Sequence, residues 1–292
     1  MIDGLFGTVR FVVKNSNFFF TICVIGHLTW FKKGGLMGFC DLVIKRPLPW
    51  LKRCHVCGGL AGVLLAWGSA QAAPVAGVWH WSAGWQHYSE AQMALKGPEL
   101  GLHWQIHGSG PFTLEADATL GLQNYSSEQT GRLSQVPNID TRWRALKTWT
   151  SQPQWQYGLG LHTHSNFLRG TTTLGFGGYD RLSTQLWLPL RWRSEVPNSW
   201  VLDAGYLLWG EHVSRLSQTS ASLPDVRNVQ RKGAYLQAST TMETSLGQMQ
   251  PFVRLTWVGD SDIQQLTLAG EERGAYEPAN KRWLLGVKWQ FR

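Results

Sequence analysis

The last ten residues before the terminal arginine constrain the fold of this chain more than any other segment. They run from Arg282 to Phe291 and read RWLLGVKWQF. The odd positions hold Trp283, Leu285, Val287, Trp289 and Phe291, whereas the even positions from 284 hold Leu284, Gly286, Lys288 and Gln290. Successive side chains of a β-strand point to opposite faces of the sheet. The segment therefore predicts a strand with one apolar, aromatic face and one largely polar face.

The same alternation recurs along residues 73–292 and predicts ten strands. Their expected ranges are 77–87, 99–107, 111–125, 139–149, 154–166, 179–193, 199–213, 229–245, 250–259 and 281–292. Segment 111–125 is the clearest, because Leu114 and Leu120 belong to an apolar parity and Glu115 to a polar one. Pro189 lies inside the sixth range. Because proline donates no hydrogen bond to a sheet, we expect a β-bulge at that position.

The expected connections alternate between short and long. Short, turn-forming segments occupy 108–110, 150–153, 194–198 and 246–249, whereas 88–98, 126–138, 167–178, 214–228 and 260–280 are longer and rich in Gly, Ser, Asn and charge. A barrel whose two ends face different compartments shows this asymmetry. The prediction is an all-β fold, a transmembrane antiparallel up-and-down β-barrel of about ten strands. Eight or twelve strands stay open, because 167–178 and 260–280 are long enough to hide strand extensions.

Aromatic residues indicate which face looks outward. Six of them lie on the apolar parity, beside two of the short turns or at the end of the chain, and form an expected aromatic girdle: Trp149, Trp155, Trp192, Trp200, Trp289 and Phe291. Amphipathic rings collect at the level of the lipid headgroups in this way. We therefore expect the apolar face to contact lipid and the polar face to line the lumen.

A leader precedes the strands. Lys52 and Arg53 are followed by the short apolar stretch 56–67, and Ala70-Gln71-Ala72 forms an A-x-A cleavage site. This order is typical of a secretory signal peptide. We expect residues 1–72, an extended or spurious N-terminus plus the signal, to be removed by cleavage after Ala72. Residues 73–292 would then form the barrel domain.

The net charge of +8 does not indicate a nucleic-acid partner. Eight of the 27 Lys and Arg and two of the 19 Asp and Glu precede residue 73, which leaves +2 for the rest. No basic stripe of the size that nucleic acid requires is visible there. All four cysteines also precede residue 73, so the expected mature chain contains no disulfide.

This pattern resembles the integral outer-membrane β-barrel proteins of Gram-negative bacteria, of the small porin-like kind. The resemblance covers residues 73–292 and implies a monomer in the outer membrane. It also implies contacts with lipid and lipopolysaccharide, and with the barrel-assembly machinery during biogenesis. In that class the last strand usually ends in an aromatic residue, whereas here Arg292 follows Phe291. No motif points to a functionally defined family within the class.

The polar parity predicts a network of charged and imidazole side chains in the lumen. Its members are His80, His103, His107, Glu115, Asp117, Arg142, Arg144, Arg181, Asp203, Arg254 and Lys288. Buried charges are costly unless they are paired. The near balance of acids and bases therefore favours a plug of salt bridges, and a narrow polar pathway is the alternative.

A second group of polar residues lies at the expected outer ends of three strands. These weak catalytic candidates are His162, His164, Ser165, Asp180 and Glu211. A Ser–His–acid set at the rim would hydrolyse a peptide or lipid ester, as omptin-like proteases and lipid A deacylases do on outer-membrane barrels. No third ligand accompanies the His-x-His pair, so we expect no metal and no cofactor.

Three functions remain from the sequence. The leading hypothesis is a non-enzymatic barrel, either a narrow pore or a structural surface protein. One alternative is an outer-membrane hydrolase with a rim active site. The other is a surface adhesin that binds through the loops 214–228 and 260–280, since long loops often carry function.

Overall fold

A computed structural model describes residues 77–108, 110–195, 200–245, 247–268 and 271–291 of the 292-residue chain. The leader expected over residues 1–72 lies outside these residues. The strands are β1 (Val78–Ser89), β2 (Met93–His107), β3 (Phe112–Ser127), β4 (Gly131–Trp149), β5 (Gln152–Phe167), β6 (Asp180–Arg193), β7 (Trp200–Ser214), β8 (Val226–Gln230), β9 (Gly233–Thr240), β10 (Met242–Thr244), β11 (Gly247–Val258), β12 (Gln264–Leu268), β13 (Glu271–Ala275) and β14 (Asn280–Phe291). A 3-10 helix spans Leu216–Gln218. Within the described ranges, no helix is both long and apolar enough to cross a membrane.

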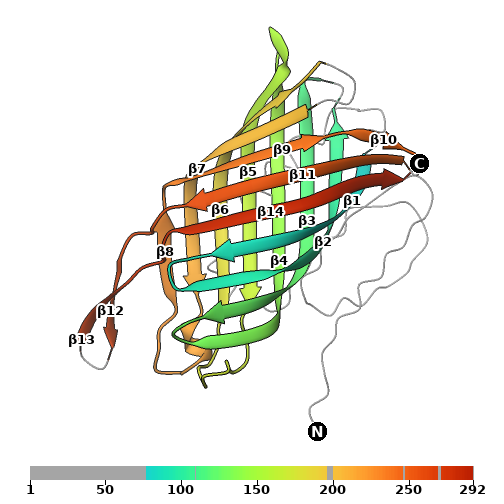
Figure 1. The fold of residues 1–292 in the computed structure, drawn as a ribbon. Coiled ribbons are helices and arrows are strands. Elements are labelled where there is room, and N and C mark those ends of the chain that lie inside the picture. The colour runs from blue at the N-terminus through green and yellow to red at the C-terminus, as the bar shows by residue number, and fades with distance from the viewer. Residues whose placement is uncertain (1–76, 109, 196–199, 246, 269–270, 292) are drawn as a thin grey trace, which may run out of the picture. The chain divides into compact units, whose positions relative to one another are not determined.

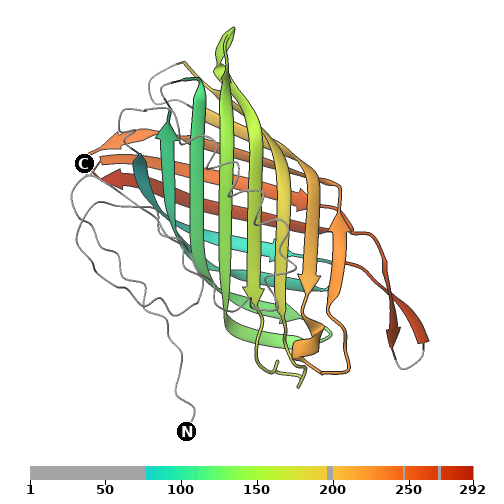
Figure 2. The same ribbon diagram turned by 180° about the vertical axis from the view of Figure 1, so that it is seen from behind.

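The strands close into an antiparallel barrel (Figures 1 and 2). Each strand from β1 to β7 pairs with its successor, β7 pairs with β8 and β9, β9 pairs with β11, and β11 pairs with β14. β14 returns to β1, with Trp289 opposite Trp81. Because β8, β9 and β10 together fill one position, the barrel has ten strands, as the sequence predicted. The single strand expected at 229–245 is therefore divided into β8, β9 and β10, and it begins earlier, at Val226.

Side-chain alternation places the apolar parity outside. Leu100 of β2 and Leu120 of β3 are directly opposite each other and are 66% and 64% exposed. On the other parity, Glu115 and Asp203 are almost completely buried. A water-soluble barrel would have the reverse distribution. An apolar exterior around a charged lumen is the arrangement of outer-membrane β-barrels.

The expected girdle residues lie near one end of the barrel. Trp149 and Trp200 are about half exposed, at 51% and 55%. Trp155, Trp192 and Trp289 are partly exposed, and the side chain of Phe291 lies outside the described part. Lys147 also lies at this end, with its ammonium 5.7 Å from the centre of the Phe112 ring. A long cationic side chain near the interface lies along apolar groups in this way.

Two of the five expected long connections are wrong. β1 and β2 are joined by residues 90–92 alone, and β3 and β4 by residues 128–130. The polar residues that suggested loops instead extend the strands. Polar side chains are tolerated there because the backbone of each hairpin stays paired while its side chains contact water. Gly131 has a φ of +92° at the end of the β3–β4 turn, which a residue with a side chain rarely adopts. The expected loop 260–280 contains the β12–β13 hairpin, which does not join the barrel.

The bulge in this region lies on β7 rather than at Pro189. Pro189 pairs in register with Gly205, and the register shifts where Leu186 faces Trp209 and Trp187 faces Leu207. Leu208 is therefore the extra residue. Beyond it, the positions of β7 that point into the lumen switch from one parity to the other. A single inserted residue has this effect because strand side chains alternate with a period of two.

Candidate functional site: the lumen and its outer rim

Two groups of buried charges fill the lumen. The first contains Arg191 of β6, whose two terminal nitrogens donate to the two carboxylate oxygens of Glu115 on β3, at 2.5 and 2.9 Å. Arg191 also donates to Asp203 of β7 at 2.8 Å. Arg144 of β4 lies within 2.8 Å of Glu115 and 2.6 Å of Asp203. These contacts tie β3, β4, β6 and β7 together across the interior.

Asp117 completes this first group. Its carboxylate pairs with His103 Nδ1, lies 3.4 Å from Arg144 and lies 3.5 Å from the ammonium of Lys288. The lysine also lies 5.8 Å from the centre of the Phe252 ring. Three acidic and three basic side chains therefore meet in this group, which we call the balanced cluster: Glu115, Asp117, Asp203, Arg144, Arg191 and Lys288.

The second group is built around one carboxylate, Asp140 of β4. Its Oδ2 atom lies 2.8 Å from His162 Nε2 and 3.2 Å from His164 Nδ1. Arg282 of β14 donates to the same oxygen at 2.6 Å, and Arg142 Nε lies 3.2 Å from Oδ1. We call these five residues the Asp140 cluster. Each imidazole directs one ring nitrogen at Asp140, and neither is hydrogen-bonded to a nucleophile among the described residues, although His164 Nε2 is buried without a partner there.

The remaining predicted lumen residues differ in their surroundings. His80 is partly buried, and its ring centre lies 5.5 Å from that of His103. His107 is exposed at the end of β2, with its Nδ1 3.4 Å from Oγ1 of the buried Thr113, and its membership of a lumen network stays a prediction; strand alternation carries no information on how close a position is to the barrel mouth. Arg181 and Arg254 are both buried.

The weak catalytic candidates do not come together. Ser165 has the opposite parity to His164 and pairs with Leu182 on the outward face. Asp180 binds Arg169 of the preceding loop at 2.6 Å and Gln218 at 2.9 Å.

Glu211 was expected on the inward parity and is turned outward. The Leu208 bulge reverses the alternation, so His212 is buried instead. Glu211 is partly exposed and binds Arg227 at 3.0 Å. A bulge leaves no clear mark in the sequence, and the residue that replaces Glu211 inside was missed for that reason.

His212 forms a Ser–His–acid contact set that the sequence did not indicate. Its Nδ1 lies 2.8 Å from Ser183 Oγ, and its Nε2 lies 3.4 Å from a Glu277 oxygen. However, Arg181 Nε also donates to Nε2, at 3.4 Å. An arginine nitrogen always carries its hydrogen, so Nε2 is the acceptor and Nδ1 holds the proton. His212 in this tautomer donates to Ser183 and does not take its proton.

Arg181 joins three segments at the outer mouth. Its Nη2 donates to Glu90, in the β1–β2 turn, at 2.5 Å and to Glu277, in the loop before β14. Two carboxyl groups thus share one guanidinium. Burial raises the pKa of the Glu277 carboxyl to about 8; Arg181 opposes the rise, and the neighbouring Glu90 carboxylate adds to it.

Apolar residues pack beside this contact. Tyr88, Leu95, Val136 and Leu168 form a buried cluster at the same end. This cluster packs β1, β2, β4 and the loop after β5 against one another beside the Arg181 contacts.

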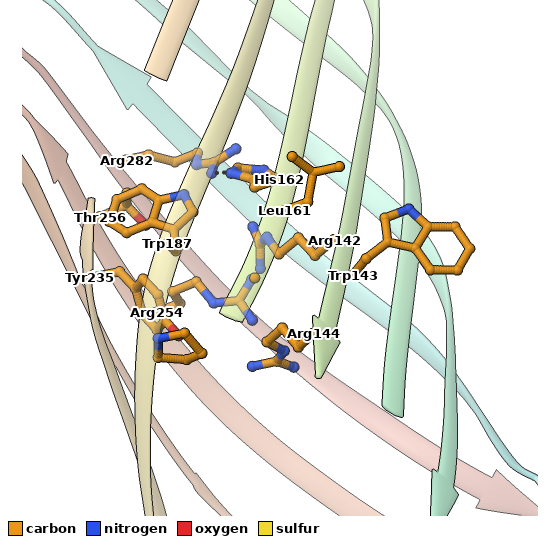
Figure 3. Close-up of a pocket in the computed structure, with 12 residues that line it drawn as sticks. Arg142, Trp143, Arg144, Leu161, His162, Trp187, Tyr235, Arg254, Thr256 and Arg282 are labelled. Atoms are coloured by element: carbon orange, nitrogen blue, oxygen red, sulfur yellow. Dashed lines mark hydrogen bonds between the residues drawn. The ribbon is translucent and has the colours of Figure 1, made fainter. Parts of the chain in front are cut away.

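Two small cavities lie among these side chains. One of about 30 Å³ is lined by residues of β4, β5, β6, β9, β11 and β14, and Figure 3 shows the side chains around it. A second, of about 20 Å³, lies near Tyr88, His164 and Ser183. A single water molecule needs about 10–15 Å³, so each cavity holds only a few small molecules. In the described part of the chain, no three His, Cys, Asp or Glu residues are placed to hold a metal ion.

No protein family matches the sequence, and no curated protein matches it. Three solved structures are similar to this chain at low sequence identity. The Neisserial surface protein A is 9% identical, with a TM-score of 0.32, over 74% of this chain and 97% of that chain. The outer membrane protease OmpT from Escherichia coli is 10% identical, with a TM-score of 0.37, over 74% and 94%. The translocator domain of the autotransporter NalP from Neisseria meningitidis is 10% identical, with a TM-score of 0.36, over 81% and 95%.

Proposed function

We propose that this outer-membrane β-barrel is a non-conducting surface protein, with a lumen that serves as a rigid core and an outer end that faces the surroundings. The observation that carries the proposal is the bidentate contact between Arg191 and Glu115, which crosses the lumen between strands that are not neighbours. The cavity that Arg144 of this cluster helps to line is about 30 Å³, enough for only a few water-sized molecules. Of the two forms of the leading hypothesis, these contacts favour the structural form over the pore.

The proposal is tested by planar-bilayer conductance of the purified full-length protein. We expect no single-channel steps from the wild type in molar potassium chloride. A matched variant, in which Glu115, Arg144 and Arg191 are all replaced by serine, removes three large side chains from the lumen and should conduct. Reproducible ion-sized steps from the wild type would contradict the proposal, and a level unchanged in the triple variant would also show that these side chains do not block the lumen.

A second candidate function is contact with a partner through the β12–β13 hairpin. This hairpin extends past the end of the barrel (Figure 1), and Ile263 and Tyr276 beside it are 64% and 56% exposed. Exposed apolar residues on a projecting hairpin are typical of contact surfaces. Replacing residues 264–275 by a short Gly-Ser turn should abolish binding of cells to host matrix while leaving the folded barrel in the membrane. Unchanged binding would exclude this candidate.

A further inference from the structure

The 30 Å³ cavity in the lumen is surrounded by cations. Arg142 and Arg144 reach it from β4, Arg254 from β11 and Arg282 from β14, with His162 at its edge. Figure 3 shows the Arg142, Arg144 and Arg254 guanidinium groups gathered in one region, whereas the ring of Trp143 points away from them. No carboxylate is among the residues that line the cavity.

Arg254 differs from the other arginines at this cavity. Its side chain is only 7% exposed. Within the described residues, its guanidinium forms no hydrogen bond and no ion pair. Its nitrogens are not among the fully buried atoms that lack a partner, so each keeps some accessible surface. The guanidinium therefore opens into the cavity. Burying an unpaired charge in this way is strongly unfavourable unless a counter-charge is nearby.

The surrounding acids do not supply that counter-charge. The charges of the balanced cluster cancel one another. In the Asp140 cluster, the single carboxylate serves both Arg142 and Arg282. Glu99 of β2 is another buried acid outside these two clusters. It forms no ion pair with any described residue. Even with Glu99 ionised, Arg142, Arg254 and Arg282 leave one positive charge without a partner.

We propose that this cavity binds one small monovalent anion of halide size, held by Arg254 and Arg142. The cavity volume fits one ion of the size of chloride with at most one or two waters, and it is too small for a sugar or nucleotide. Guanidinium nitrogens are donors only, so an anion satisfies them directly. The anion would join β4 to β11 through Arg142 and Arg254 and neutralise the excess charge of the lumen. The inference holds whether or not the barrel conducts.

Bromide provides the probe, because it replaces chloride and scatters anomalously. In crystals of the full chain grown in sodium bromide, we expect an anomalous peak beside the Arg254 guanidinium. Arg254→Met should remove the peak, whereas Arg273→Met, at an exposed arginine of the β12–β13 hairpin, should keep it. A wild-type crystal without a peak in the cavity, or a peak that persists in Arg254→Met, overturns the proposal.

Stability provides a second measurement that does not require the variant to crystallise. At constant ionic strength, exchanging gluconate for bromide should raise the urea midpoint of the wild type, because a ligand that binds only the folded state stabilises it. Arg254→Met should show no such dependence and should exceed the wild type in gluconate, since it no longer buries an unpaired charge. If Arg254→Met does not fold, the wild type alone decides: equal midpoints in the two salts overturn the proposal.

Discussion

Arg191 and Glu115 form a bidentate ion pair across the lumen. The two terminal guanidinium nitrogens, Nη1 and Nη2, each donate to one carboxylate oxygen, at 2.5 and 2.9 Å. The two residues lie on β6 and β3, which are separated in the barrel by β4 and β5. A contact between non-neighbouring strands restrains the shape of the whole barrel. Each of the two residues is about 95% buried, so neither charge is screened by bulk water.

Arg191→Met should destabilise the barrel by about 3–5 kcal/mol, because it leaves Glu115 and Asp203 with an uncompensated buried charge. Urea unfolding in detergent micelles measures the change. The double variant Glu115→Leu, Arg191→Met removes both charges, and its loss should be smaller than the sum of the two single losses. Strictly additive losses would show that the pair is not coupled.

The outward face gives the second prediction. Leu120→Arg places a charge near the middle of the lipid-facing surface and should cost about 2–4 kcal/mol of folding free energy in lipid vesicles. The matched control is Leu174→Arg, in the outer loop after β5, where the leucine is 59% exposed. A surface change of that kind should cost no more than about 0.5 kcal/mol. Equal costs at the two positions would contradict the membrane orientation.

Glu277 predicts a dependence of stability on pH. Its pKa in the folded protein is about 8, above the ordinary value of 4.5, so the folded state binds the proton more tightly than the unfolded state. The contribution of this group is present below pH 4.5 and is lost as the pH rises towards 8. Glu277→Gln mimics the protonated form and should remove this part of the dependence. The test compares the urea midpoints of the wild type and Glu277→Gln from pH 4 to 9. Parallel curves would show that Glu277 is not the source of this pH dependence.

The leader gives a prediction that lies outside the described residues. N-terminal sequencing of the protein exported by Gram-negative cells should begin at Ala73. Replacing Ala70 and Ala72 by large residues should block this cleavage, because signal peptidase sites require small side chains. A mature protein that begins upstream of residue 50 would show that the early segment is retained.

Much of the barrel could be predicted because strand alternation is a local property. The parity that placed Asp117 and Lys288 inside also applies to Glu99, Asp140, Arg191 and Arg282, which the same pattern could have identified. The inward turn of His212 could not be predicted in this way, because it depends on a one-residue bulge at Leu208.

The partners of the charged residues were also beyond the sequence. Which arginine meets which carboxylate depends on how the barrel closes, and Arg282 and Asp140 are 142 residues apart. The same closure determines that Arg254 is left without a carboxylate. The lengths of the outer hairpins were misjudged because a polar strand that contacts water on both faces has the composition of a loop.

The central claim is that the apolar side chains of the barrel contact lipid and the polar ones line the lumen. The orientation of side chains along β3 tests it most directly. Ala118, Thr119 and Leu120 would each be replaced by a spin-labelled cysteine in a full chain whose four natural cysteines are serines. In lipid vesicles, the labels at 118 and 120 should collide frequently with dissolved oxygen, which concentrates in the acyl chains, and the label at 119 should not. High collision rates at 119, with low rates at 118 and 120, would mean that the polar face looks outward and would contradict the account.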